Sequence, residues 1–583
     1  MNQPQDLART VLYLDIGTVN TRVSLFDYRD QSYLFIGAAS AATSGGDSNY
    51  SIYSGVVDAV RKLERATKRR FLDQNSNFVI PMKLGITGVD QIGFSYTCTS
   101  DPRIALMGLT RTGSLQNLRN LLANTGIRPV VEICAADGLD ISENIDRLLN
   151  ADPRIVILAG GTEIGAEKAV YRLGEILMLA CKSLTREQRP EILFMGSALA
   201  GQQMERVFSK ISDFSYAPNV LEIGSIGHSS LDSLLSVMNR NAEKQVSGLK
   251  DLVERSKTTG VPGEFAFGRS VRLMSRLIKE NQHVLGIDIG SDHTVVAKAK
   301  NLDLSLEVLP LGMGKRITEL LNNFELSELQ SWIGFQIKES EVQDYICNKS
   351  VYPDLVPGNQ YSAQIEQALT RFVLKKCAKE AGMNSILRDG SLGMVLLCGS
   401  VVRNVEDPGD SLLIGMDGLH PFGAVDYFLD MNGLTSAVGA LAQLNPILIS
   451  HIMNASTFLN LGKVITPYFN QKNSKIQDGK KFMSVAVRDD AGNVRKFDVP
   501  RGRIYRIPLD FGKNYELDFL KIPKEVSIPG VRTWTPLGFK SGCFGIVFDT
   551  RGDALELPKD RTSQISKLKF WKDELGPWTI QPS

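Results

Sequence analysis

The sequence lacks the cysteine pattern of a disulfide-stapled or zinc-binding protein. Its seven cysteines are scattered along the chain, odd in number, and never spaced as CxxC. Disulfide frameworks use even sets of cysteines and structural zinc sites use close pairs, so neither organises this chain. Most of the cysteines lie in apolar runs, where a buried thiol is the ordinary role. We therefore expect a reducing, cytoplasmic setting.

Signatures of several enzyme classes are also missing. The five histidines show no HxxxH or HExxH spacing, and the sequence contains neither GxSxG nor GxxxxGK[ST]. These motifs place metal ligands, an activated serine and a phosphate-binding P-loop, respectively. Metal-hydrolase chemistry, nucleophilic catalysis and a P-loop nucleotide site are therefore unsupported.

Excess charge of one sign and long hydrophobic runs are absent as well. Lysine and arginine number 66 against 64 acidic residues, a formal net charge of +2. Such a balance creates no field that attracts nucleic acid or an anionic membrane. No apolar run approaches the roughly 20 residues that cross a bilayer, and residues 1–9 are polar, unlike a signal peptide. We expect no nucleic-acid partner, no membrane insertion and no secretion.

What the sequence does contain is an apolar run that ends in an aspartate and a small-residue turn, within residues 11–27. The pattern predicts a strand, a tight turn and a second strand. Glycine, hydroxyl, amide and basic groups in such a turn suit a phosphate. The candidates are Gly17, Thr18, Asn20, Thr21 and Arg22. Asp15 can hold a metal-bound water, although an ordinary hairpin is the alternative for one copy alone.

A second copy of this pattern occurs at residues 285–297. Its Asp288, Gly290, Ser291 and Thr294 match, in order, Asp15, Gly17, Thr18 and Thr21. A repeat separated by about half the chain indicates two related lobes. We expect each lobe to offer one hairpin to a shared cleft, where the two hairpins clamp a triphosphate.

Paired DxG hairpins, each opening a lobe, resemble the actin, heat-shock chaperone and sugar-kinase superfamily. The sequence also contains, besides Arg22 after the first hairpin, LAGGTE at 158–163, ILFMGS at 192–197 and LLCGS at 396–400. These stretches resemble one family of that superfamily, MutL/GlmL, which is accessory to adenosylcobalamin-dependent glutamate mutase and unrelated to the mismatch-repair protein of the same name. The similarity runs from about residue 10 to the C-terminus, in a long form with an extra C-terminal region.

The resemblance implies a bound ATP and Mg²⁺. Asp15 and Asp288 would hold the metal through waters and act in catalysis, while the hairpin groups bind phosphate. Gly399 and Ser400 would pack beneath the adenosine; a plain strand-to-loop turn is the alternative there. Many relatives carry an acid just after the second hairpin's threonines, and Val295 stands in that place here. ATP binding is therefore the prediction, and whether the chain is an ATPase is left open.

We predict an α/β protein with a two-lobed actin-like ATPase fold and duplicated ribonuclease-H-like lobes. From about residue 78 to 235 short apolar runs alternate with amphipathic helices, which predicts an inserted, mainly parallel βαβα region in the first lobe. The predicted parts are residues 1–240 for this first lobe, 241–283 for a helical crossover, 284–462 for the second lobe and 463–583 for a β-rich C-terminal domain. In this last part we expect a hairpin at 543–557 and a short basic helix after Arg561.

The turn at residues 160–163, Gly-Gly-Thr-Glu, supports two interpretations. It either shapes a cleft or partner-binding surface at the end of a parallel strand, or it only starts the next helix. The sequence does not decide between them.

Three functions remain. The first is a MutL/GlmL-like ATP-binding protein that serves as accessory chaperone or reactivase of an adenosylcobalamin-dependent mutase, and its lobes would close on the nucleotide. The second is a small-molecule kinase of the same fold, which needs a substrate base that the sequence does not reveal. The third is a nucleotide-binding scaffold that does not hydrolyse ATP. The sequence leaves the protein partner and the oligomeric state open.

Overall fold

The computed structural model describes residues 8–44, 51–83, 86–99, 102–162, 165–221, 228–454, 457–469 and 476–578. The chain forms two compact units, which are described separately. Unit 1 comprises Met1–Ala266 and Ala440–Leu444, and unit 2 comprises Phe267–Gly439 and Asn445–Ser583. Among the described residues, no helix is both long enough and apolar enough to cross a membrane.

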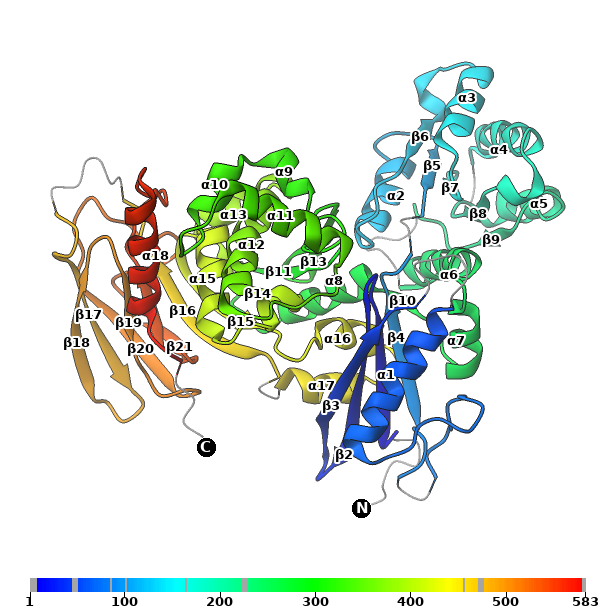
Figure 1. Cartoon of the computed structure of the whole chain (residues 1–583). Coiled ribbons are helices and arrows are strands. Elements are labelled where there is room, and N and C mark those ends of the chain that lie inside the picture. The colour runs from blue at the N-terminus through cyan, green and yellow to red at the C-terminus, as the bar shows by residue number, and fades with distance from the viewer. Residues whose placement is uncertain are drawn as a thin grey trace. The chain divides into compact units, whose positions relative to one another are not determined.

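Unit 1 begins with a five-stranded sheet in the order β10-β4-β1-β2-β3. Its strands are β1 (Thr10–Ile16), β2 (Asn20–Arg29), β3 (Ser32–Ala42), β4 (Gln91–Tyr96) and β10 (Val261–Pro262). The first three pair antiparallel, whereas β4 runs parallel to β1 and β10 parallel to β4. Helix α1 (Ile52–Thr67) lies across this sheet and buries Val56, Val60 and Leu63 against it (Figure 1).

An α/β region is inserted between β4 and β10. Its five strands are β5 (Ile104–Gly108), β6 (Val131–Cys134), β7 (Ile155–Ala159), β8 (Glu191–Phe194) and β9 (Phe214–Tyr216), in the order β6-β5-β7-β8-β9. Every neighbouring pair is parallel, which confirms the predicted βαβα region. The helices are α2 (Ser114–Ala123), α3 (Ile141–Ala151), α4 (Glu167–Lys182), α5 (Ala198–Phe208), α6 (His228–Gln245) and α7 (Leu249–Ser256).

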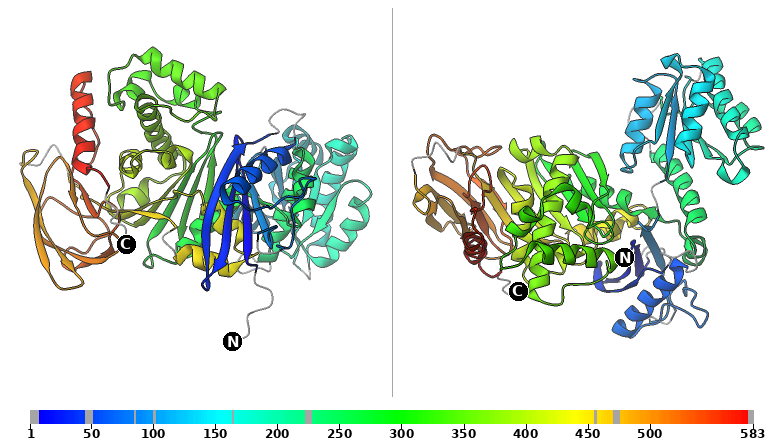
Figure 2. Two further views of the ribbon diagram at one scale, coloured as in Figure 1. Left: turned by 60° about the horizontal axis from the view of Figure 1, so that its bottom comes forward. Right: turned by 45° about the horizontal axis from the view of Figure 1, so that its top comes forward.

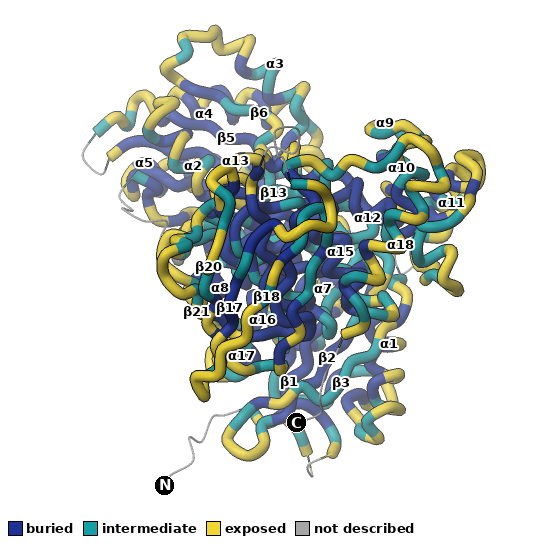
Figure 3. Tube along the Cα trace, turned by 90° about the vertical axis from the view of Figure 1, so that its left-hand side faces the viewer, coloured by how far each residue is buried: buried dark blue, intermediate teal, exposed yellow. Residues whose placement is uncertain are grey.

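This inserted sheet has a hydrophobic core on each face. Residues of α2 and α6 pack on one face, and residues of α3, α4 and α5 pack on the other. The right-hand view of Figure 2 shows the sheet between its two helical layers. Figure 3 shows the contrast between β5, which is buried throughout, and α3, most of which is exposed or half-buried. Because both faces are covered, the strands are almost uniformly apolar, as parallel strands are.

Unit 2 contains an eight-stranded sheet in the order β13-β12-β11-β14-β15-β16-β22-β19. These strands are β11 (His283–Ile289), β12 (Thr294–Lys300), β13 (Asp303–Leu309), β14 (Leu392–Cys398), β15 (Gly423–Leu429), β16 (Leu459–Thr466), β19 (Ile504–Ile507) and β22 (Ile546–Asp549). Strands β11 to β13 pair antiparallel, and β14 and β15 continue the sheet in parallel.

Helices connect and cover the strands of this sheet. They are α8 (Gly263–Met274), α9 (Glu319–Asn323), α10 (Leu326–Ser331), α11 (Glu339–Val351), α12 (Gln360–Glu380), α13 (Asn384–Arg388), α14 (Ser400–Arg403), α15 (Pro408–Leu419), α16 (Thr435–Leu441) and α17 (Pro446–Asn454). The long helix α12 packs with α15 against one face of the sheet, where Leu369, Val373 and Tyr427 join the largest core.

The five-stranded sheet β10-β4-β1-β2-β3 of unit 1 has the same order and strand directions as the part β15-β14-β11-β12-β13 of the unit 2 sheet. In each, three consecutive strands pair antiparallel, and two further strands run parallel to the first of them. This is the duplicated ribonuclease-H-like arrangement, so the predicted α/β, two-lobed actin-like fold is confirmed. The four-part division of the chain by residue number stays a prediction.

The C-terminal region is rich in strands, as predicted. A second sheet of unit 2 contains β17 (Lys481–Asp489), β18 (Val494–Pro500), β20 (Asn514–Lys521) and β21 (Leu537–Lys540), in the order β18-β17-β20-β21. The predicted basic helix is α18 (Arg561–Leu575). The predicted hairpin at 543–557 is wrong, because only β22 forms there and it pairs with β16 and β19. Leu555 and Leu557 instead pack against the main core.

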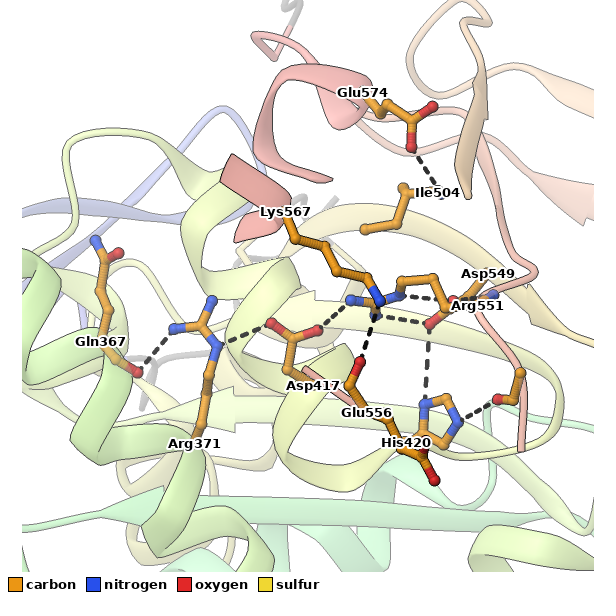
Figure 4. Close-up of polar contacts among 11 residues, drawn as sticks. Gln367, Arg371, Asp417, His420, Ile504, Asp549, Arg551, Glu556, Lys567 and Glu574 are labelled. Atoms are coloured by element: carbon orange, nitrogen blue, oxygen red, sulfur yellow. Dashed lines mark hydrogen bonds and ion pairs between the residues drawn. The ribbon is translucent and has the colours of Figure 1, made fainter. Parts of the chain in front are cut away.

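A buried charge network joins the end of β22 to the helices of the second lobe. Asp417 of α15 accepts hydrogen bonds from Arg371 Nε and from Arg551 Nη1, each at 2.8 Å. Arg551 also forms an ion pair with Asp549, and all three side chains of the Asp417–Arg551–Asp549 chain are almost fully buried. Figure 4 shows Asp417 lying between the two guanidinium groups.

His420, at the C-terminal end of α15, extends this network. Its Nε2–H donates to the carbonyl oxygen of Gly552 at 2.9 Å, and its Nδ1 lies 3.9 Å from Asp549. Burial lowers the pKa of His420 below its ordinary value, although Asp549 opposes that shift and Arg551 adds to it. The folded protein therefore favours the neutral ring.

This burial predicts a pH-dependent stability. Below about pH 6.5 an unfolded histidine binds a proton that folded His420 resists, so the free energy of unfolding falls as the pH drops below that value. We expect His420→Asn, which suits the left-handed backbone here (φ 45°), to reduce this slope by up to about 1.4 kcal/mol per pH unit. Denaturant unfolding of wild type and variant between pH 5 and 7.5 measures it. Equal slopes in the two proteins would contradict the prediction.

Candidate functional site

The first predicted site lies at the turn between β1 and β2. Gly17 N–H donates to the carbonyl oxygen of Asn20 at 3.0 Å, and this bond closes the turn. A Cβ at Gly17 would lie 2.9 Å from that same oxygen, so a side chain does not fit without a shift. Thr18 is half-buried and Asn20 is exposed. The turn therefore presents backbone and small polar groups at its surface, which is what an anion-binding tip requires.

Neighbouring residues fix the two ends of this turn. Asp15, half-buried near the end of β1, accepts a hydrogen bond from Ser95 Oγ of β4 at 3.2 Å. Thr21 is fully buried, and its hydroxyl lies 2.9 Å from that of Thr43. Thr43 in turn donates to the Gly17 carbonyl at 2.9 Å. Thr21 thus ties the turn to the segment after β3.

The second hairpin, between β11 and β12, repeats this geometry. Gly290 N–H donates to His293 O at 3.0 Å, and a Cβ at Gly290 would lie 2.7 Å from that oxygen. Thr294 is fully buried, like Thr21, and its hydroxyl donates to Leu311 O at 2.6 Å. Asp288 is half-buried near the end of β11, in the place that Asp15 has in β1. The sequence repeat is therefore also a repeat of hydrogen bonds.

The loop after β13 packs on the second turn. Lys315 N–H donates to Ser291 Oγ at 3.1 Å, and Gly314 N–H donates to Ser291 O at 3.0 Å. From the same loop, Arg316 Nε donates to Asp292 at 3.1 Å. The neighbouring His293, together with Arg316, holds the pKa of Asp292 below its ordinary value despite partial burial. The second turn thus carries an ionised carboxylate.

Gly399 lies beside the second hairpin, at the end of β14. Strand β14 runs parallel to β11 with Cys398 opposite Asp288, which brings Gly399 next to Ile289. The backbone φ of Gly399 is 107°, and a Cβ there would lie 2.3 Å from the Ile289 carbonyl oxygen. Ser400, exposed, begins the short helix α14. Only glycine allows this close approach of two backbones.

The structure thus gathers the predicted residues into two groups. One group, at the β1–β2 turn of unit 1, contains Asp15, Gly17, Thr18, Asn20, Thr21 and Arg22. The other, at the ends of β11, β12 and β14 in unit 2, contains Asp288, Gly290, Ser291, Thr294, Gly399 and Ser400. The hydroxyls of Thr21 and Thr294 bond to Thr43 and to Leu311 O, which holds the turns, and their contact with phosphate stays a prediction.

Sequence reasoning missed Asp430, which follows β15. Its buried carboxylate accepts hydrogen bonds from the backbone N–H groups of Leu434 and Thr435 and from the Thr435 hydroxyl. That hydroxyl lies 3.2 Å from Cys398 Sγ, next to Gly399. Asp430 therefore caps α16 and supports the end of β14. The signal was an aspartate shortly before a run of small helical residues, a capping pattern.

The oxygen donors of the two hairpins suit Mg²⁺, and they do not form a site in which protein side chains alone hold a metal. The first hairpin supplies Asp15 and the second supplies Asp288, beside hydroxyl and backbone groups, while Asp292 of the second turn is paired with Arg316. Among the residues that the structure describes, no three His, Cys, Asp or Glu side chains lie together as a metal cluster. Mg²⁺ keeps several waters and is commonly bound by one or two carboxylates plus phosphate oxygens. The chemistry of the site therefore suits a metal that arrives with a phosphate ligand.

The Gly160–Gly161 turn after β7 is buried and closely packed. A Cβ at Gly160 would lie 2.6 Å from Leu109, and Asn219 Nδ2 donates to Gly161 O at 2.9 Å. This packing gives both glycines a structural role in the inserted region. Glu163, the last residue of the motif, lies outside the described residues.

Comparison with solved structures finds proteins of low identity. Gluconate kinase from Lactobacillus acidophilus is 11% identical, with a TM-score of 0.30 over 79% of this chain and 94% of that one. A glycerol dehydratase reactivase is 12% identical, with a TM-score of 0.30 over 75% and 100%. Component A of (R)-2-hydroxyglutaryl-CoA dehydratase from Acidaminococcus fermentans is 9% identical, with a TM-score of 0.25 over 74% and 95%. The fold assignment rests on the sheet topology, since these scores are too low to carry it.

Comparison with curated proteins finds no match. The family model described as MutL protein, by contrast, matches residues 11–457, which is well over half of the chain. The match begins at the first hairpin and includes the second hairpin and the Gly399 turn. This chain belongs to the MutL protein family.

Proposed function

We propose that this protein binds ATP with Mg²⁺ through its two DxG hairpins and acts as an accessory protein of an adenosylcobalamin-dependent mutase, similar to glutamate mutase. The observation that carries the nucleotide part is the repeat of one turn geometry in two lobes of the same topology. Each copy has an aspartate one residue before the end of the first strand, a glycine whose N–H bonds to the carbonyl oxygen three residues later, and a buried threonine whose hydroxyl bonds to a neighbouring segment. The mutase part rests on membership of the family.

In this proposal the chain's own groups divide the work of binding. Backbone N–H groups of the turns, with Thr18 and Ser291, donate to phosphate oxygens, and Arg22 offsets their charge. Gly399 and Ser400 leave room for the nucleoside. Asp15 and Asp288 would hold Mg²⁺ through waters, and the bound metal would neutralise phosphate charge.

Nucleotide-dependent movement is the output that such a protein offers a partner. Binding energy that differs between two conformations can shift a protein between them. A mutase that has trapped a damaged cobalamin is the kind of partner that such movement would serve. Hydrolysis of ATP would return the protein to its nucleotide-free conformation.

The accessory role is tested with a purified glutamate mutase that has been inactivated with cyanocobalamin. The mutase is incubated with this protein, adenosylcobalamin and Mg²⁺, with or without ATP, and recovered mutase activity is measured. We expect mutase activity to recover only when ATP is present. The control Asp303→Ala, which changes an exposed carboxylate in β13 of the unit 2 sheet, should restore activity as wild type does. Recovery that is equal without ATP, or no recovery at all, would contradict the mutase role.

A further inference from the structure

A hollow of about 1100 Å³ lies within unit 2, away from the predicted nucleotide residues. It lies over the starting half of β14, between α8, the end of α17 and the loops around β21. The second hairpin and Gly399, by contrast, lie at the finishing ends of β11 and β14. Small-molecule sites have volumes of about 300–1000 Å³, so this hollow has the size of a large ligand site.

The floor of the hollow is an apolar face of the eight-stranded sheet. Side chains alternate along a strand, so Met394 and Leu396 of β14 lie on this face, whereas Val395 lies in the helical core. Phe428 of β15 is opposite Leu396 in the register and lines the hollow beside it. Leu396 is fully buried, but Met394 and Phe428 remain partly exposed. The sheet therefore presents uncovered apolar side chains to the hollow.

The walls add more thioether and aromatic groups to those of the floor. These wall residues are Met274, Met453, Phe458, Phe511 and Phe539. Sulfur and the faces of aromatic rings are polarisable, so both kinds of side chain pack well against a flat ring. The composition of the lining thus favours an aromatic ligand.

The charged groups of the lining do not select the charge of a ligand. At the floor, Lys463 and Asp426 form a 2.8 Å ion pair directly across β15 and β16. The other charged lining residues are exposed and have both signs; they are Lys279, Glu280, Asp389, Arg532 and Lys540. Water and salt screen exposed charges. What the hollow offers a ligand is therefore the apolar surface of its floor and walls.

The rim is held together but carries exposed apolar side chains. The Gly390 loop before β14 and the Gly530 loop before β21 pack backbone to backbone, which joins the two sheets of unit 2 at this edge. Leu277, on the rim, is 59% exposed, and Trp534, between the lining residues Arg532 and Thr535, is 80% exposed. Exposed apolar groups around a hollow are typical of a binding site.

We propose that this hollow binds an apolar aromatic small molecule. The ring would lie on Met394 and Phe428, and its removal from water onto these side chains would drive binding. The inference does not depend on the proposed ATP site, because that site uses the opposite end of β14.

N-phenyl-1-naphthylamine, an uncharged aromatic molecule that fluoresces strongly in apolar surroundings, is the probe. Gly538 of β21 lines the hollow, is exposed and has no atom within 4 Å of a Cβ built there, so Gly538→Trp adds a ring at the hollow without a clash in the fold. Gly358 has the same free space but does not line the hollow, which makes Gly358→Trp the matched control.

A second variant changes the floor itself. Met394→Lys keeps an unbranched side chain but places an ammonium group on the floor beside Asp426, the residue opposite Met394 in the register. A bound ring would strip water from that charge, which is unfavourable. The control is Leu520→Lys, because Leu520 of β20 is 51% exposed and does not line the hollow.

Titration of the full chain, followed by the fluorescence of the probe, should show one saturable site in wild type and in both controls. We expect at least tenfold weaker binding in Gly538→Trp and in Met394→Lys, and unchanged binding when excess ATP and Mg²⁺ are present. Melting temperatures confirm that the variants are folded. No saturable binding, unchanged affinity in either folded hollow variant, or displacement of the probe by ATP would overturn the proposal.

Discussion

Replacing Asp417 by alanine is expected to destabilise unit 2 by about 3–5 kcal/mol, because it leaves two buried guanidinium groups without their shared partner. Arg371 and Arg551 both donate to this carboxylate at 2.8 Å, and Arg551 is 2% exposed. Burial alone would lower the pKa of Arg551, but Asp549 and Asp417 outweigh burial and raise it. Asp549 remains beside Arg551 in the variant, and arginine keeps its proton in proteins, so Arg551 stays charged there. Equilibrium unfolding in guanidinium chloride measures the loss.

The matched control for this prediction is Asp510→Ala. Asp510 forms an ion pair with Lys513 at 2.8 Å, but the two side chains are 56% and 65% exposed. Exposed pairs are screened by water and contribute little to stability. We expect the unfolding midpoint of Asp510→Ala to match that of wild type. A similar midpoint for Asp417→Ala would show that the network does not stabilise the fold.

Replacing Gly399 by alanine is expected to lower the free energy of unfolding by about 2–6 kcal/mol and to weaken ATP binding at least tenfold. The cost has two parts, the strain of an L residue at φ 107° and the contact of its Cβ with Ile289 O at 2.3 Å. Backbone strain of this kind costs about 1–3 kcal/mol and overpacking about 1–3 kcal/mol. The displaced end of β14 lies beside the second hairpin, which is why nucleotide binding should weaken as well.

Gly382→Ala separates the two parts of that cost. Gly382 has φ 60° and no atom within 4 Å of its Cβ, so the control carries the backbone strain alone. We expect it to lose about 1 kcal/mol of stability and to keep its affinity for ATP. If Gly399→Ala is no less stable than Gly382→Ala, then the close approach to Ile289 does not constrain this position.

Local patterns in the sequence predicted the lobes and the inserted region well. The DxG turns were recognisable because hairpin formation depends on residues close in sequence, such as Gly17 and Asn20. The alternation of apolar runs and amphipathic helices likewise predicted the parallel inserted sheet. Both patterns occur within short windows of the sequence, where the spacing of apolar residues indicates the secondary structure.

Long-range pairings could not be predicted in this way. Strand β22 pairs with β16, more than 70 residues away, and no local signal distinguishes that partner from a hairpin neighbour. The expected hairpin at 543–557 fails because Arg551 turns inward to Asp417, 134 residues away in the sequence. The bonds of Thr21 and Thr294 to the segments after β3 and β13 span 22 and 17 residues, which is still beyond the short window that the hairpin pattern covers.

The most direct test of the account is a calorimetric titration of the purified chain with ATP in the presence of Mg²⁺. Asp15→Ala and Asp288→Ala are titrated alongside Asp303→Ala, an exposed carboxylate outside both hairpins. We predict one-to-one binding in wild type and in the control, at least tenfold weaker binding in each hairpin variant, and weaker binding when EDTA removes the metal. No binding by the folded wild type, or unchanged affinity in both hairpin variants, would contradict the account.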